Sequence, residues 1–153
     1  MFLQTNDRLI NLQNVSNINI LRGRRRIVFN MNYSIEIDNN GKKKLVSDYA
    51  YWDAVSDADF ELNIAHLENH EYFQDEFIRQ QYVGSNVTGY INLNEISSIK
   101  FSDKKNRVIF NLANAIMYRD QDNNERLTSD FVYVNCGSTE SYNEYKEYVE
   151  SIK

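Results

Sequence analysis

The sequence predicts an α+β fold made by tandem duplication of one unit, in which three or four antiparallel strands precede a helix. The first observation is an internal repeat: residues 10–37 align with residues 91–118 without a gap, and nine of the 28 aligned positions are identical. Self-similarity at a fixed offset is typical of a duplicated supersecondary unit. The second observation is that strand-like alternation precedes a helical pattern in each copy. We therefore expect pseudo-two-fold symmetry and one shared core.

Alternating apolar residues predict the strands of each unit. Ile18 and Ile20 alternate with polar residues, as do Ile99 and Phe101 at the aligned positions. This pattern is typical of a strand with one buried face. In residues 26–38 the odd-numbered positions are apolar, and this alternation continues over more residues than a usual strand contains. This segment is either one long bent strand or a hairpin with a two-residue turn, and the sequence leaves both open.

A later strand of each unit carries aromatic residues. The match between the copies resumes after one inserted residue, so the offset there is one residue larger. The aligned residues are Ser47, Asp48, Tyr49 and Tyr51 in the first copy and Ser129, Asp130, Phe131 and Tyr133 in the second, and Trp52 follows in the first copy. Aromatic residues favour strands, and such rings more often belong to a core than to a binding surface.

A helix is expected to close each unit. Ser56 is a predicted N-cap for a helix over 57–80, and Ser138 is a predicted N-cap for a helix over 139–152. The apolar pattern slips near Asn69, which predicts that the first helix kinks or restarts there.

These elements predict the limits of the two repeats. The first repeat covers residues 1–80 and the second covers residues 88–153, with a linker at about 81–87 marked by a turn-forming Gly-Ser-Asn run. Because the linker is short, we expect the two repeats to lie against each other as one compact domain.

Composition limits the classes of partner. The net charge is −5, which argues against duplex DNA or an anionic membrane as the default partner, because both require a positive surface. The single cysteine, Cys136, excludes an internal disulfide and fits a reducing compartment. The first residues lack the pattern of a signal peptide, and no run of apolar residues is long enough to span a bilayer. We expect a cytoplasmic protein that does not enter a membrane.

The opening segment of each copy resembles short uncharacterised proteins of low-GC bacteria and their phages. Residues 10–18 and 91–99 both fit the pattern INLxxV/IxxI. This resemblance implies a phage or mobile-element origin, and it carries over no functional residues. The predicted order of strands and helix is also similar to that of Whirly-type single-stranded DNA-binding proteins and of small pleckstrin-like modules, a likeness of fold order alone.

Few residues have the type and spacing of metal ligands or catalytic groups. His66 and His70 have the helical spacing of two metal ligands, but their stripe reads as the solvated edge of an amphipathic helix, and the second copy contains no histidine. Cys136 aligns with Ala54, where a small buried residue is expected. We expect no catalytic residue, no metal site and no cofactor, and therefore no enzyme.

Basic clusters at predicted hairpin turns suggest an alternative function. Together with the strand aromatics they can line a groove for single-stranded nucleic acid, with cations for phosphate and rings for stacking. The candidate residues are Arg22, Arg24, Arg25, Arg26, Lys104, Lys105 and Arg107. Charged hairpin turns are also common for solubility alone.

Acidic residues gather on the predicted helices and favour a protein partner. The candidate contact residues are Asp59, Glu61, Glu68, Glu71, Glu144 and Glu147. Segregated charge of this kind is typical of a solvated helix face or of an adaptor surface. The sequence therefore favours a non-enzymatic protein-interaction module, such as a phage or mobile-element accessory factor or inhibitor that acts on a host protein. Exposed strand edges make a homodimer an alternative.

Overall fold

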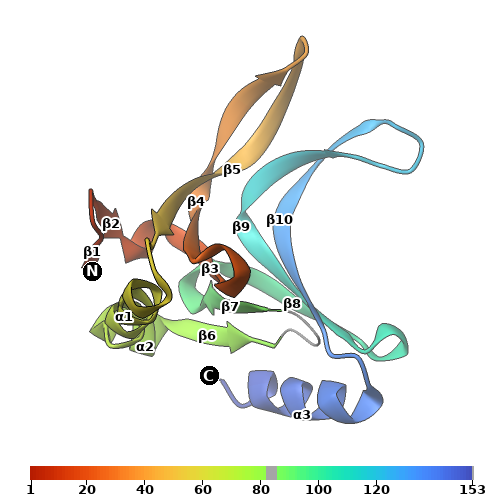
Figure 1. The fold of residues 1–153 in the computed structure, drawn as a ribbon. Coiled ribbons are helices and arrows are strands. Elements are labelled where there is room, and N and C mark those ends of the chain that lie inside the picture. Colours follow the sequence, from red (N-terminus) through yellow and green to blue (C-terminus); the bar gives the residue numbers. More distant parts are fainter. Residues whose placement is uncertain (82–85, 153) are drawn as a thin grey trace.

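The protein is an α+β molecule in which antiparallel sheets dominate and helices are few, as the sequence predicts (Figure 1). The computed structural model describes residues 1–81 and 86–152, except for the side chains of Asn39 and Tyr118. The strands are Phe2–Gln4 (β1), Leu9–Asn11 (β2), Val15–Leu21 (β3), Arg26–Asn39 (β4), Lys42–Asp53 (β5), Phe77–Gln80 (β6), Val87–Asn92 (β7), Ile96–Ser102 (β8), Arg107–Arg119 (β9) and Glu125–Asn135 (β10).

The strands form two main sheets and a small ribbon. A five-stranded sheet has the order β5-β4-β3-β7-β6, a three-stranded sheet has the order β10-β9-β8, and β1 pairs with β2. The pairing of β3 with β7 joins residues from the two predicted repeats within one sheet, with Ile18 opposite Tyr90. The two repeats are therefore not separate sheets, because β7 belongs to the sheet of the first repeat.

Serine side chains start the two longer helices. The helices are Asp57–Glu68 (α1), Glu71–Glu76 (α2) and Thr139–Glu150 (α3). Ser56 Oγ accepts a hydrogen bond from the backbone N–H of Asp59 at 3.1 Å, and Ser138 Oγ accepts one from Ser141 at 3.1 Å. Each bond satisfies one of the free N–H groups at a helix start, which is the role expected of an N-cap.

The first helical region is shorter than the sequence predicts. We expected a helix over 57–80, but residues 77–80 form strand β6, and α1 and α2 flank Asn69. The physical reason is that residues 77–80 pair with β7, with Ile78 opposite Ile91. This pairing supplies backbone hydrogen bonds that favour a strand over a helix. Part of the predicted linker, residues 82–85, lies outside the described residues, and β7 begins at Val87.

The buried apolar residues form two clusters and not the single shared core that we expected. Phe77 belongs to the cluster under α1 and α2, whereas its neighbour Ile78 belongs to the cluster under α3. Successive residues of a strand point to opposite faces of a sheet. The β6–β7 end of the five-stranded sheet therefore separates the two clusters, and each helix region covers its own side.

Two long hairpins extend beyond the rest of the molecule (Figure 1). Residues 26–39 form one continuous strand, which settles the choice that the sequence left open. At the end of the β4–β5 hairpin, Asn40 and Gly41 have φ values of 56° and 78°. Positive φ at both turn residues is the geometry of a type I′ turn, and glycine adopts it without steric cost. We call residues 33–48 the first arm and residues 114–130 the second arm.

The arms are joined near their bases, whereas their tips lie apart (Figure 1). Ser47 Oγ of the first arm donates a hydrogen bond to Asp130 Oδ2 of the second arm at 2.9 Å, and it accepts one from Asn114 Nδ2. Ser34 Oγ donates to the backbone carbonyl of Ala115. The side of the first arm that carries Ser34 and Ser47 therefore faces the second arm.

Candidate interaction surfaces

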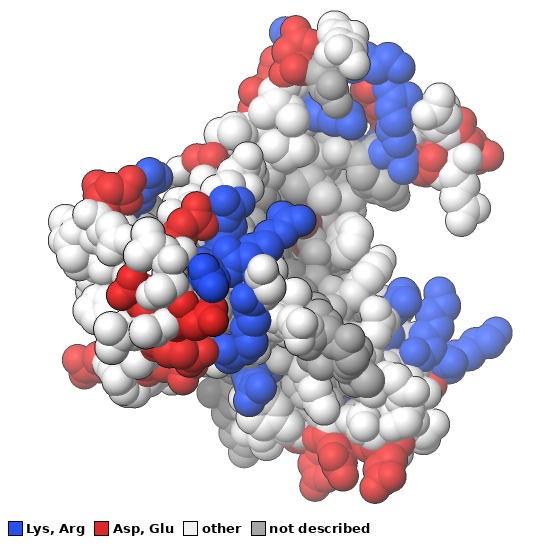
Figure 2. All heavy atoms as spheres, in the orientation of Figure 1, with Lys and Arg blue, Asp and Glu red and all other residues white. Residues whose placement is uncertain are grey.

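The first basic turn, residues 22–26, connects β3 to β4 and is largely neutralised by carboxylates. Figure 2 shows its basic side chains, which are all arginines, beside the acidic residues over α1. Arg24 is exposed and has no ion pair within the described residues. The hydrogen bond to Asp53 raises the pKa of Arg26. The ion pairs of this turn, measured from nitrogen to oxygen, are Arg22–Glu61 at 3.3 Å, Arg25–Asp57 at 2.7 Å and Arg26–Asp53 at 2.6 Å.

The second basic turn, residues 103–107, connects β8 to β9 and lacks these carboxylates. Lys104 and Lys105 are exposed, and neither has an ion pair in the described part of the chain. Arg107 Nε donates a hydrogen bond of 2.6 Å to the neutral Asn135 Oδ1. The positions aligned with the acids Asp53, Asp57 and Glu61 are the neutral Asn135, Thr139 and Asn143. The positive charge of the second turn therefore stays uncompensated on this side.

Asp103 is the one acid of the second basic turn, and its carboxylate contacts two side chains of α3. Tyr142 Oη donates a hydrogen bond to Asp103 Oδ1, and Lys146 Nζ lies 3.6 Å from the same oxygen. The hydrogen bond from Tyr142, followed by the charge of Lys146, lowers the pKa of Asp103. Burial, together with this hydrogen bond, raises the pKa of Tyr142 to about 12.

Two stacked ring pairs lie at matching positions on β5 and β10. The rings of Tyr49 and Tyr51 are stacked with centroids 4.8 Å apart, and those of Phe131 and Tyr133 are stacked at the same distance. The guanidinium of Arg26 lies 4.1 Å from the ring centre of Tyr51, and that of Arg107 lies 4.7 Å from Tyr133. Trp52, by contrast, is buried. The expectation that these rings belong to the core is thus correct for Trp52 and wrong for Tyr49, Tyr51 and Tyr133, which are exposed.

The outer side of the first arm exposes apolar residues that sequence analysis did not assign to a site. Ile35 is 36% exposed and Ile37 is 38% exposed. Ile35 lies opposite Val46, and Ile37 lies opposite Lys44, so the four side chains share one face. We call this surface the arm face; its residues are Ile35, Ile37, Val46, Lys42 and Lys44. The only sign of this surface in the sequence was the alternation of apolar residues in 26–38, which is longer than a single buried strand requires.

The acidic candidates for protein binding are exposed, but they lie on different helices. Asp59 and Glu61 belong to α1 with Glu68, Glu71 begins α2, and Glu144 and Glu147 belong to α3. Figure 2 shows one acidic region over α1 and α2 and another over α3. Glu61 already pairs with Arg22. The structure therefore divides the six residues between two surfaces.

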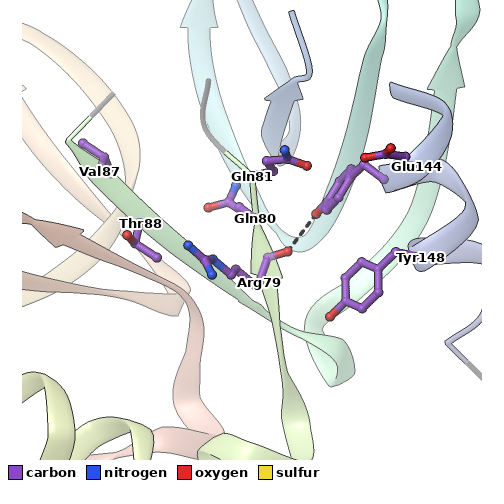
Figure 3. Close-up of a pocket in the computed structure, with 8 residues that line it drawn as sticks. Arg79, Gln80, Gln81, Val87, Thr88, Glu144 and Tyr148 are labelled. Carbon is purple, nitrogen blue, oxygen red and sulfur yellow. Dashed lines mark hydrogen bonds between the residues drawn. The ribbon is translucent and has the colours of Figure 1, made fainter. Parts of the chain in front are cut away.

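A cleft of about 490 Å³ lies between β6 and α3. Figure 3 shows Arg79 and Gln80 of β6 on one side and Glu144 and Tyr148 of α3 on the other. Tyr145 Oη donates a hydrogen bond of 3.0 Å across the cleft to the backbone carbonyl of Arg79. This bond holds α3 against the edge of the five-stranded sheet.

The two histidines and the cysteine make packing and hydrogen-bond contacts with the rest of the fold. His70 Nε2 lies 3.1 Å from the backbone carbonyl of Phe2, and the ring of His66 lies edge-on to Trp52 with centroids 6.0 Å apart. Cys136 is buried, as expected from its alignment with Ala54, and burial raises the pKa of its thiol. Among the described residues, no group of three or more His, Cys, Asp or Glu side chains is placed to hold a metal ion.

Comparison with protein-family models, with curated proteins and with solved structures finds no match to this chain. Within residues 1–81 and 86–152, every helix is too short or too polar to span a membrane. The arrangement of charge and exposed apolar surface is therefore the basis on which a function can be assigned.

Proposed function

We propose that this protein is a non-enzymatic interaction module that binds a protein other than a second copy of itself through the arm face. In this proposal it acts in the cytoplasm as an accessory factor or inhibitor of a host protein. The observation that carries the proposal is the position of Ile35, Ile37 and Val46 on one side of a hairpin that extends beyond the body, beside two lysines without an ion pair among the described residues.

The energetics of an isolated hairpin support this proposal. A two-stranded hairpin without a covered apolar face is marginally stable in water. The first arm has one side held against the second arm through Ser34 and Ser47, whereas on the arm face Ile35 and Ile37 stay more than one third exposed. A partner that covers Ile35 and Ile37 removes apolar area from water and stabilises the arm at the same time.

Charge on the arm specifies the chemistry of the partner. Lys43 pairs with Glu36 at 3.3 Å on the side opposite the arm face. Lys42 and Lys44 lie on the arm face and have no ion pair among the residues that the structure describes. The complementary surface is an apolar groove bordered by carboxylates, because lysines at the rim of an apolar contact favour acidic neighbours.

Capture of partners by matched variants tests the proposal. The immobilised chain is exposed to a lysate of the cells that encode it, alongside Ile35→Lys/Ile37→Lys and the control Leu62→Lys. Leu62 is a suitable control because it is apolar and 68% exposed but lies on α1. We expect a protein that wild type and the control retain and that the arm variant loses at least tenfold, because two apolar contacts are replaced by charges.

The same experiment contains the outcomes that overturn the proposal. Retention of the same proteins by all three chains, or retention of none, contradicts binding through the arm face. Circular dichroism first establishes that both variants are folded. Sedimentation velocity of the purified chain then separates a second copy from another protein as the occupant, and an arm-dependent dimer also contradicts the proposal.

We further propose that the chain arose by tandem duplication and has pseudo-two-fold symmetry. In support, β3 and β8 are both seven residues long, each is followed by a one-turn 3-10 helix, and each turn ends in a residue with positive φ, Arg25 or Asn106. The N-caps Ser56 and Ser138 also occupy aligned positions. A high-resolution experimental structure in which the two halves superpose by a rotation near 180° tests this proposal, and halves related by another operation contradict it.

A further inference from the structure

The face of the three-stranded sheet opposite α3 is partly exposed and basic. In the register of the sheet, Lys100, Ile109 and Tyr133 form one row across the strands, and Asn111 lies opposite Phe131 in the next row. Their neighbours Val108, Phe110 and Val134 point to the other side and are buried under α3. We call this surface the open sheet face; its residues are Lys100, Arg107, Ile109, Asn111, Phe131 and Tyr133.

Charge distinguishes the open sheet face from the equivalent surface of the first half. Between Ile96 and Arg107 the chain carries four cations, Lys100, Lys104, Lys105 and Arg107, and one acid, Asp103, whose oxygen is engaged by Tyr142. In the first basic turn, three of the four arginines are paired with carboxylates. Figure 2 shows the basic group over the β8–β9 turn apart from the acidic residues of α1 and α2. A polyanion is therefore attracted to the second turn more strongly than to the first.

The rings on this face supply a second kind of contact. Tyr133 is 41% exposed, and it is stacked on Phe131, which fixes the orientation of its ring. The guanidinium of Arg107 lies 4.7 Å from the ring centre of Tyr133 and holds its charge beside that ring. Exposed rings beside a row of cations fit a ligand that alternates phosphate groups with flat bases, as single-stranded nucleic acid does.

We propose that the open sheet face, together with the second basic turn, binds single-stranded nucleic acid without strict sequence preference. Lys104, Lys105, Lys100 and Arg107 contact phosphates. When Arg107 turns toward a phosphate, it uncovers the ring face of Tyr133 that it now covers, and that face stacks on a base. This proposal is independent of the arm face, because the two surfaces share no residue. It also places the nucleic-acid site on the second half alone, although the sequence suggested both basic turns.

Fluorescence anisotropy with labelled 20-nucleotide single-stranded DNA and RNA of mixed sequence tests this proposal. We expect binding at 50 mM salt that weakens with a logarithmic salt slope of about −2.8 if all four cations contact phosphate, at about 0.7 for each contact on a single strand. Lys104→Gln/Lys105→Gln is expected to reduce that slope to about −1.4. Tyr133→Ala is expected to weaken binding about 5- to 150-fold, the range for loss of one stacked base.

The first half supplies matched controls. Arg24→Gln/Arg25→Gln removes the same amount of charge from the first basic turn, and Tyr51→Ala removes the aligned ring. We expect both controls to bind the oligonucleotides within twofold of wild type. No binding at 50 mM salt, or equal losses in the variants of the two halves, overturns the proposal. Binding of an acidic polypeptide such as polyglutamate with the same dependence on Tyr133 also overturns it, since it assigns the face to anionic proteins.

Discussion

Arg107 Nε donates a hydrogen bond of 2.6 Å to Asn135 Oδ1, at the position where Arg26 makes an ion pair of 2.6 Å with Asp53 in the first half. The geometry is retained and the carboxylate is replaced by an amide. Both arginines also lie over a tyrosine, Tyr51 or Tyr133. At this position the two halves therefore differ in charge and not in geometry, and the second arginine stays available to an anion.

Asn135→Asp is predicted to convert the second basic turn into a copy of the first. The introduced carboxylate pairs with Arg107, so oligonucleotide binding by the open sheet face should weaken. The effect on the free energy of unfolding should stay within about 1 kcal/mol, as is usual for an exposed ion pair. Anisotropy and urea denaturation measure the two effects, with Asp53→Asn as the reciprocal variant. Unchanged oligonucleotide affinity in Asn135→Asp contradicts the assigned role of Arg107.

Phe110→Ala is predicted to destabilise the whole molecule, including the first cluster. Phe110 is fully buried in the second cluster, and such a truncation costs about 3–5 kcal/mol. Trp52, the one tryptophan, is buried in the first cluster and reports on it by fluorescence. Because β7 pairs with β3, we expect the tryptophan transition in urea to shift to lower concentration. A tryptophan transition that stays at the wild-type midpoint shows that the two clusters unfold independently.

Tyr142→Phe is predicted to change how stability depends on pH. The pKa of Asp103 is lowered below its usual 3.8. The stability that its ionised carboxylate contributes is therefore present above about pH 4 and is lost as the pH falls further. The pKa of Tyr142 is raised to about 12. The stability that its neutral hydroxyl contributes is therefore present below about pH 10 and is lost between about pH 10 and 12. The phenylalanine variant should show smaller losses of Tm at both ends of the pH range. Identical pH profiles for the two proteins exclude this hydrogen bond as the cause.

Ser138→Ala is predicted to lower the free energy of unfolding by about 1 kcal/mol, because it leaves the N–H of Ser141 without the oxygen that now caps it. Ser138→Asp, which keeps an acceptor at the N-cap, serves as the control and should retain most of the stability. Thermal denaturation measures both variants. Equal stability of the alanine and aspartate variants shows that water satisfies this N–H group equally well.

The sequence predicted the features that depend on neighbouring residues. Both helix caps, the antiparallel strands and the break near Asn69 follow from local patterns such as Ser56 before an apolar helical stripe. Residues 77–80 could not be predicted in the same way. Their apolar residues fit either a helix or a strand, and the choice is made by pairing with β7, which is distant in sequence.

The candidate surfaces show the same division between local and distant causes. The clusters of basic residues are visible in the sequence, but their state of charge is not, because the partners Asp57 and Glu61 come from α1. The exposure of Ile35 and Ile37 could not be predicted, because their alternation is the same whether or not another element covers them. Only the three-dimensional arrangement shows that the first arm extends past the body (Figure 1).

Site-specific photo-crosslinking from the arm face in living cells tests the proposed function most directly. A photoreactive amino acid is placed at position 37, in the arm face, and in a parallel chain at position 62, on α1. The proposal predicts a crosslinked adduct with another protein from position 37 that is absent from position 62. No adduct from position 37, the same adducts from both positions, or an adduct with twice the 18.1 kDa mass of the chain contradicts it.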